Sequence, residues 1–450
     1  MTYPALIGEA KSSLLARGLG LVVAVGALGA FALTLSRLLD RYPPTPQIVV
    51  GFAIGLLGAL ALALLSFDLA IAIGVFLLAA VRFEPAPTDL LFAVVITVGV
   101  ATGRVDFRRI PVGAALLVWA FLTLNLVSAI DVADPVRAAS FFAITLYVAI
   151  FGLWLASYVT SSDAARRITR AYVVAAVASA VLASLALLVA FPGSHLFTRI
   201  GRAEGLFKDP NVFGPFLVPA ALIVLEEILA PRLFHARRSA KLVAFAALAV
   251  GVLFSYSRSA WLNLGVGVLV VLTVIAFRRG EGRQAGRAVA VVLVAAAAVT
   301  ATVALSGSTT FLEQRAQLQS YDSTRFGAQS ESIRFAERHP LGIGPGQFER
   351  YASVSVHSTY ARALAEEGLL GLLLMLALVI ATLASAGRNA IDGRDTYGIG
   401  SAALLGAWCG ILVNSLFVDT LHWRHLWFVA ALIWAGSYRA RGVDRAGPLT

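Results

Sequence analysis

GLLGLLLMLALVIATLAS occupies residues 368–385 and contains no charged side chain. An apolar run of about 17 to 25 residues can cross the hydrocarbon core of a bilayer as one helix. Such runs recur from end to end of the chain, with short polar breaks between them. We therefore expect an all-α, polytopic transmembrane helix bundle of about 12 to 14 spans, with one long periplasmic or extracellular loop.

The composition of the chain supports this prediction. Of its 450 residues, 59% are hydrophobic and 14% are charged, a balance that no water-soluble domain of this length could carry on its surface. The third and fourth runs are short for a full crossing, so the span count is a range. Apolar runs bounded by charges place spans near residues 16–36, 47–66, 68–82, 89–102, 111–131, 138–160, 170–191, 211–230, 241–255, 259–277, 288–305, 359–385, 397–418 and 424–438.

The formal net charge of +11 predicts orientation rather than nucleic-acid binding. Basic residues of membrane proteins gather in cytoplasmic loops, and here alternate breaks are the basic ones. This pattern places both termini in the cytoplasm, and the breaks near 192–209, 256–258, 306–356 and 419–423 on the outer face of a bacterial inner membrane. The basic breaks contain Arg104, Arg108 and Arg109; Arg166, Arg167 and Arg170; Arg237, Arg238 and Lys241; Arg278, Arg279, Arg283 and Arg287; Arg388 and Arg394; and Arg439 and Arg441.

Four regions follow from these spans. We expect N-terminal transmembrane helices over 1–191, further transmembrane helices over 192–305, an extracytoplasmic loop over 306–356, and C-terminal transmembrane helices over 357–450. The start of the chain, with Lys11 and Arg17 before an apolar run, resembles a signal peptide, but the many following spans favour an uncleaved first helix.

The outer loop has a composition that predicts order. From Ser323 to Arg338, charges alternate with Phe326, Ile333, Phe335 and Ala336 at near-helical spacing, which predicts an amphipathic helix across the outer mouth. His339 before Pro340 disfavours further helix, and the glycines from 342 to 346 predict a tight turn.

The first motif that could form a functional site is RAEGLFKDPN, residues 202–211, on the outer side of the next span. Pro210 and Asn211 are typical of a helix start, whose unpaired amides and positive dipole end face the outer aqueous layer. Arg202 and Lys208 beside this start make it a ready anion site. The alternative is that both cations only extend to lipid headgroups and Asp209 only caps the helix.

The second motif is SYSRSAW, residues 255–261, in an almost unbroken apolar stretch. A guanidinium at the bilayer centre costs about 2.5 to 3.5 kcal/mol unless it is paired or faces a polar cavity. No acidic residue adjoins Arg258 in sequence, which favours an external anion as its partner. At the outer interface this cost disappears, and Arg258 would then be an ordinary turn residue.

The third motif is HSTYARALAEEG, residues 357–368, where the chain re-enters the membrane. Near neutral pH a histidine can take a proton or donate to phosphate, so His357 is a candidate general base or phosphate ligand. A lone histidine more often has a structural role. The presence of Arg202 and Arg258 on the same face favours a shared site.

His422, Arg424 and His425 form a weaker candidate group in the last outer turn. They could line the same cavity, or they could act with Trp423 and Trp427 as interfacial anchors.

Other site classes find no support in the sequence. The Gly342–Gly346 turn lacks a preceding strand and faces outward, so it is not a nucleotide-binding fingerprint. No Asp-x-Asp pair and no cluster with metal-ligand spacing occurs, which favours a mechanism without metal or cofactor. Cys409 is the only cysteine, so one chain forms neither a disulfide nor a cysteine metal site.

With these motifs, the sequence resembles the O-antigen ligase and polymerase superfamily of bacterial membrane glycosyltransferases. The segments that carry the resemblance are RAEGLFKDPN, SYSRSAW, HPLGIGPGQF (339–348) and HSTYARALAEEG, in that order and around one long outer loop. They cover roughly the second half of the chain. Each motif is short, and the specificity comes from four of them in order on one face.

The resemblance implies transfer of a glycan from an undecaprenyl diphosphate carrier to a hydroxyl of a glycan, lipid or protein acceptor. It implies inversion at the anomeric carbon, without metal or nucleotide. The paired arginines of the family correspond to Arg202 and Arg258, and its loop histidine corresponds to His357. Relatives commonly have asparagine after this histidine, where this chain has Ser358, which leaves the acceptor side open.

The resulting hypothesis is that Arg202 and Arg258 grip the diphosphate and stabilise the charge of the leaving group, while His357 deprotonates the acceptor or holds the diphosphate. Alternatives are a polymerase of the same superfamily and, from another class, a transporter or flippase for polyprenyl-linked sugars. The sugar, the acceptor and the oligomeric state are left open. Further candidates for binding diphosphate and substrate are Lys208, Asn211, Tyr256 and Ser358.

Overall fold

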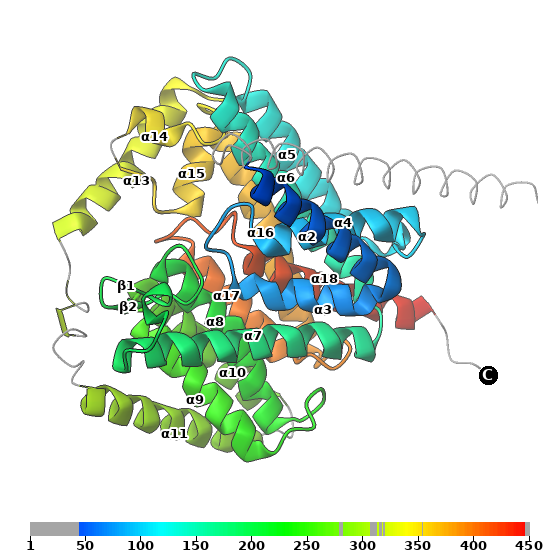
Figure 1. Cartoon of the computed structure of the whole chain (residues 1–450), viewed down its shortest axis with the longest axis vertical. Coiled ribbons are helices and arrows are strands. Elements are labelled where there is room, and N and C mark those ends of the chain that lie inside the picture. Colours follow the sequence, from blue (N-terminus) through cyan, green and yellow to red (C-terminus); the bar gives the residue numbers. More distant parts are fainter. Residues whose placement is uncertain are drawn as a thin grey trace, which may run out of the picture.

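The computed structural model describes residues 45–278, 282–306, 313–314, 317, 320–352 and 354–445. In this part of the chain, 16 α-helices, three short 3-10 helices and a single two-stranded sheet account for the regular structure (Figure 1). The predicted all-α helix bundle is therefore confirmed.

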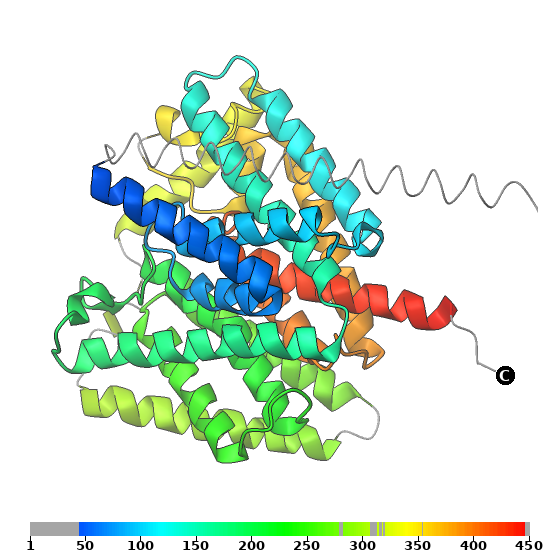
Figure 2. The same ribbon diagram turned by 45° about the vertical axis from the view of Figure 1, so that its right-hand side comes forward.

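The first half of the described chain forms six α-helices, with α3 packed against both α4 and α7. Figure 2 shows α2, α3 and α4 running across the same side of the bundle. These helices are α2 (Pro46–Leu65), α3 (Phe67–Phe76), α4 (Pro87–Ala101), α5 (Val112–Ser128), α6 (Pro135–Tyr158) and α7 (Ser162–Leu188).

Helix α8 (Pro210–Leu229) is the centre of the second half, because every residue from Phe213 to Leu229 is buried. Around it pack α9 (Arg238–Phe254), α10 (Arg258–Phe277) and α17 (Ser401–Asn414). Glycines let α10 and α17 approach closely: a Cβ on Gly406 would lie 2.6 Å from the carbonyl oxygen of Gly267. Small residues at a helix crossing are typical of membrane bundles.

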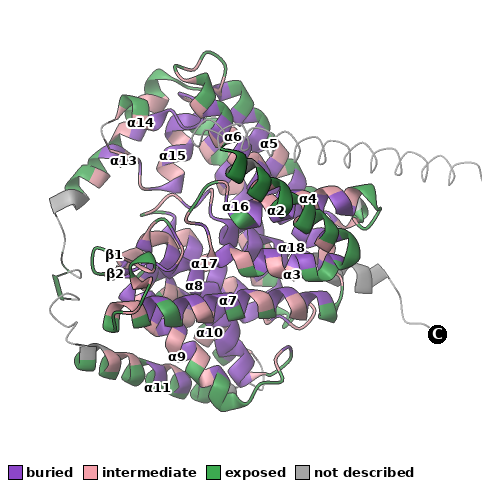
Figure 3. Cartoon of the chain, in the orientation of Figure 1, coloured by how far each residue is buried: buried purple, intermediate pink, exposed green. Residues whose placement is uncertain are grey.

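The outer helices of the bundle keep apolar side chains exposed, as lipid-facing helices do. Figure 3 shows the exposed residues concentrated on α2 and α11 (Gly282–Ser306), with buried residues on α8, α17 and α18 (Arg424–Arg445). Helix α10 has no charged residue after its first turn, and its apolar Leu269 is nevertheless 64% exposed.

Five described helices, α6, α7, α8, α10 and α16 (Gly368–Ile391), are long and apolar enough to cross a membrane, and six further apolar helices are shorter. The predicted span at 16–36 lies outside the described residues. The total of 12 to 14 spans therefore stays a prediction.

The predicted continuous span at 359–385 is wrong. The chain forms α15 (Thr359–Glu366) and α16 as separate helices, and Gly368, the first residue of α16, has a φ of +71°. A Cβ at this position would lie 2.1 Å from the carbonyl oxygen of Pro340. Because the outer loop packs this tightly against the junction, only glycine fits there.

The outer loop contains α13 (Ser320–Arg338) and α14 (Phe348–Tyr351). The predicted helix from 323 to 338 is confirmed, and of its predicted apolar residues Phe335 packs against Phe348, with ring centroids 5.5 Å apart. Phe326 and Ile333 are 50% and 54% exposed, while Ala328 and Ser332 are buried. The helix packs on α15 through these small side chains, which allow a close approach.

Candidate functional site

A tight hairpin positions the first arginines of the site. Strands β1 (Thr198–Arg199) and β2 (Arg202–Ala203) pair antiparallel, with Arg199 opposite Arg202. The two residues between them, Ile200 and Gly201, both have positive φ, as a two-residue hairpin turn requires. This turn directs Arg202 toward the start of α8, where its Nη2 donates to Asn211 Oδ1 at 3.0 Å and its Nε donates to the carbonyl oxygen of Ser255 at 2.8 Å.

Two helix N-termini meet beside these arginines. Helix α8 begins at Pro210, and Asp209 caps it by accepting from the Asn211 amide at 2.7 Å. The chain reverses between α9 and α10 over three residues, with Tyr256 at a φ of +47°, and α10 begins at Arg258. The positive dipole ends of both helices therefore point to the same space.

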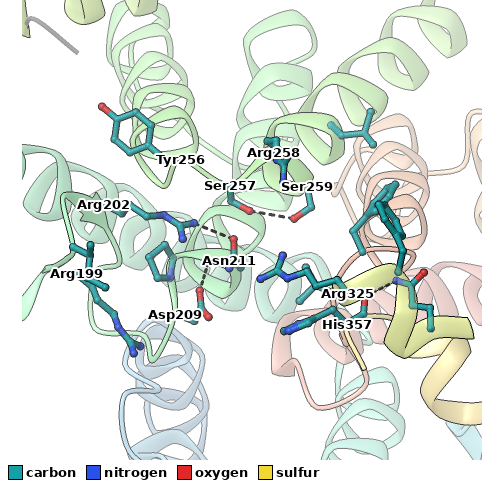
Figure 4. A pocket seen from close by; sticks show the side chains of 17 residues that line it. Arg199, Arg202, Asp209, Asn211, Tyr256, Ser257, Arg258, Ser259, Arg325 and His357 are labelled. Carbon is teal, nitrogen blue, oxygen red and sulfur yellow. Dashed lines mark hydrogen bonds between the residues drawn. The ribbon is translucent and has the colours of Figure 1, made fainter. Parts of the chain in front are cut away.

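The opposite wall comes from the outer loop. His357 lies in the segment before α15, and Arg325 extends from α13 toward it (Figure 4). Gln329 of α13 donates to the carbonyl oxygens of His357 and Leu416, both at 3.2 Å. This side chain holds the histidine segment against α13 and against the segment that follows α17.

These walls enclose a cavity of about 510 Å³, within the usual size range of ligand pockets. Its charged lining comprises four guanidiniums, one imidazole and one carboxylate, so an anion is the favoured occupant. Among the described residues, it is lined by Arg199, Ile200, Arg202, Asp209, Pro210, Asn211, Tyr256, Ser257, Arg258, Ser259, Leu262, Arg325, Phe326, Gln329, His357, Phe417 and Val418.

The cavity keeps His357 neutral. Burial lowers the pKa of this imidazole below its usual value of 6.5, the Arg325 guanidinium lowers it further, and Asp209 opposes the shift. A neutral imidazole has a lone pair that can accept a proton at neutral pH.

The structure brings five of the residues singled out from the sequence into this one cavity, namely Arg202, Asn211, Tyr256, Arg258 and His357.

Two of the other candidates are placed elsewhere. Lys208 forms a salt bridge with Glu84 at 2.6 Å and does not line the cavity. Ser358 is 5% exposed and caps α15, where its hydroxyl accepts from the Ala361 amide at 3.3 Å.

His422, Arg424 and His425 are not among the residues that line the cavity either. Arg424 is buried against Asp89, with its Nη2 2.5 Å from Asp89 Oδ2. His422 forms a hydrogen bond with Thr145 at 2.8 Å, and both histidines pack against aromatic rings. Arg424 thus pairs with a buried acid on α4, whereas the sequence left open whether it lines the cavity or acts as an interfacial anchor.

Sequence reasoning missed Arg199, Arg325 and Asp209 as cavity residues. The residues Ile200 and Gly201 after Arg199 did not predict a hairpin turn, because isoleucine rarely adopts positive φ. Arg325 lies in the predicted amphipathic helix, but the sequence did not show that this residue lines the cavity. Asp209 was identified only as a helix cap.

The chain matches one known family. Residues 243–376 match the family model described as O-Antigen ligase, and this range contains Arg258, Arg325 and His357. No curated protein matches the chain. This match, over part of the chain, supports a relationship to the O-antigen ligase superfamily.

Proposed function

We propose that the protein transfers a glycan from an undecaprenyl diphosphate carrier to an acceptor hydroxyl, at the outer face of a bacterial inner membrane. Its family makes it an O-antigen ligase or polymerase type of membrane glycosyltransferase. The observation that carries the donor assignment is the convergence of four arginines and two helix N-termini on one cavity with a histidine.

The donor diphosphate is assigned to Arg202 and Arg258. Negative charge grows on the diphosphate as its bond to the anomeric carbon breaks, and guanidiniums fixed in advance stabilise that charge best. Arg202 is held by Ser255 and Asn211, so it is oriented before the substrate arrives. The amides that begin α8 and α10 add partial positive charge at the same place.

The acceptor side is assigned to His357. The acceptor oxygen attacks the anomeric carbon and its proton passes to the neutral imidazole. The carbon–oxygen bond to the diphosphate breaks, and its electron pair leaves with the lipid diphosphate. Attack from the side opposite the leaving group inverts the anomeric centre. The shared wall of His357 and Arg325, across from Arg202, supports this division of the cavity (Figure 4).

The proposed acceptor is the lipid A-core or a similar molecule, and a second carrier-linked glycan would make the protein a polymerase. Both use the same donor chemistry. A flippase would need an ion gradient or another energy source, whereas glycosyl transfer needs only donor and acceptor.

The test is incubation of purified protein in detergent with an undecaprenyl diphosphate-linked glycan, with lipid A-core or a second donor molecule as acceptor. We expect a larger glycoconjugate and free undecaprenyl diphosphate by mass spectrometry, without any gradient. Donor that stays intact with every acceptor, combined with movement of the donor across proteoliposome membranes, would refute the transferase assignment in favour of a flippase.

A further inference from the structure

Behind the cavity, a buried arginine connects three segments of the outer face. Arg362 lies on α15, and its residue is 5% exposed. Its Nη2 lies 2.5 Å from Glu349 Oε1, its Nη1 lies 2.7 Å from Glu366 Oε1, and its Nε lies 2.8 Å from Asp419 Oδ2. We call these four side chains the Arg362 cluster.

The cluster holds both ends of the segment that carries His357. Before the histidine, Ser355 donates to Glu349 at 2.6 Å and accepts from Arg362 at 3.2 Å. After it, Ser358 begins α15, on which Arg362 and Glu366 lie. The backbone between these two points has only two residues, so its course depends on where the cluster fixes its ends.

The cluster also fixes the neighbouring segments. Glu366 accepts from the amides of Gly346 and Phe348, at 2.7 and 3.2 Å, and thereby docks the glycine-rich turn onto α15. Asp419 directly follows Phe417 and Val418, which line the cavity. One guanidinium thus connects the turn, the histidine segment and the cavity wall after α17.

Within the cluster, the contact between Arg362 and Glu349 is suited to a permanent structural role, whereas burial raises the pKa of the Glu366 carboxyl to about 7. Arg362 holds the pKa of the Glu349 carboxyl at about 2, so this carboxylate stays ionised at any physiological pH. A buried arginine with several carboxylates keeps a defined geometry, because the planar guanidinium fixes the direction of each contact. Lysine could not reach these oxygens in the same way.

We propose that Arg362 is a positioning residue that holds His357 at the cavity, through Glu349, Glu366 and Asp419. Its role in transfer rests on the proposed function, but its effect on the placement of His357 does not. The same cluster could instead serve only the stability of the fold, so the test must report on His357 itself.

The test is the rate at which diethyl pyrocarbonate modifies His357, resolved from the other five histidines by peptide mass spectrometry. Exposed His195, in the short 3-10 helix Ser194–Leu196 before β1, is the internal reference in each sample. In Arg362→Gln we expect the modification rate of His357 to rise about fivefold or more, with His195 unchanged. The matched control is Arg350→Gln, which removes a half-exposed guanidinium paired with Asp134 and should leave both rates as in the wild type.

An unchanged His357 rate in folded Arg362→Gln would overturn the proposal. If Arg362→Gln does not fold, the test uses Asp419→Asn, which keeps the side-chain shape and removes one charge. The modification rate of His357 should then rise about twofold, and an unchanged rate contradicts the proposal. Transfer by Arg362→Gln should show kcat lower by about 10- to 100-fold with the donor KM unchanged. Full transfer by His357→Ala would refute the proposed function and leave the labelling result standing.

Discussion

At the scale of single residues, two kinds of arginine differ in their surroundings. Arg362 and Arg424 are buried and paired with carboxylates, which neutralise them within the protein. Arg202 donates hydrogen bonds to neutral oxygens of Ser255 and Asn211. Such contacts orient a guanidinium before a ligand binds.

The first prediction concerns the two hydrogen bonds that the Arg202 guanidinium donates to Ser255 and Asn211. In Arg202→Lys, a single ammonium cannot reach both Ser255 and Asn211, so the cation loses its orientation. We expect the donor KM to rise about tenfold or more in steady-state transfer assays. The exposed Arg338→Lys should stay within about twofold of the wild type. A wild-type donor KM in Arg202→Lys would contradict the assigned donor contact.

The second prediction concerns pH. Because burial and Arg325 lower the pKa of His357, its neutral, proton-accepting form persists to pH values below 6.5. The acid limb of kcat/KM should therefore lie below pH 6.5. Removal of the nearby positive charge in Arg325→Gln should raise the histidine pKa, and so move this limb to higher pH. A limb that stays in place, or moves to lower pH, would show that His357 is not the titrating base.

At the scale of elements, the junction of α15 and α16 shows what hydropathy leaves out. The apolar run from residue 368 predicted a membrane helix, and α16 is long and apolar enough to be one. The span drawn at 359–385 also included Arg362, Glu366 and Glu367, of which Arg362 and Glu366 lie on the separate helix α15. The break depends on a carbonyl of Pro340, which packs there only in the folded protein. On α13, small residues such as Ala328 and Ser332 are buried, and hydropathy alone does not identify them.

The third prediction tests this junction. Gly368→Ala places a methyl group where backbone lies and puts alanine at a positive φ, so it should lower the free energy of unfolding by more than about 2 kcal/mol. The measurement is unfolding in mixed detergent and SDS micelles. Gly387→Ala on α16 meets no atom within 4 Å and should be neutral or stabilising by up to about 1 kcal/mol. Equal stabilities for the two variants would contradict the described junction.

At the scale of the whole molecule, the sequence predicted that distant motifs lie on one face, because alternate breaks between spans lie on the same side of the membrane. Helices α8 and α10 both begin on the face that the charge pattern assigns to the outside, and His357 lies between the outer loop and α15. The alternation of the spans did not predict which charged residues pair with each other. Lys208 pairs with Glu84 and Arg424 with Asp89, across separations that no local pattern reveals.

The fourth prediction concerns this orientation. In a Cys409→Ala background, a cysteine at exposed Glu337 on α13 should react with a membrane-impermeant maleimide in spheroplasts, because we assign that loop to the outside. A cysteine at exposed Asp392, after α16, should react only after the membrane is permeabilised. The reverse pattern would place the cavity at the cytoplasmic face and contradict the use of an outer-leaflet donor.

The most direct test of the account is the transfer rate of purified Arg258→Ala with an undecaprenyl diphosphate-linked glycan, at matched expression and membrane insertion. Loss of this guanidinium from the start of α10 should lower kcat by about 100-fold or more, because the charge on the departing diphosphate loses a fixed partner. Exposed Arg338→Ala, assayed in parallel, should transfer at the wild-type rate. Transfer by Arg258→Ala at the wild-type rate would contradict the claim that this cavity is where the glycan leaves its carrier.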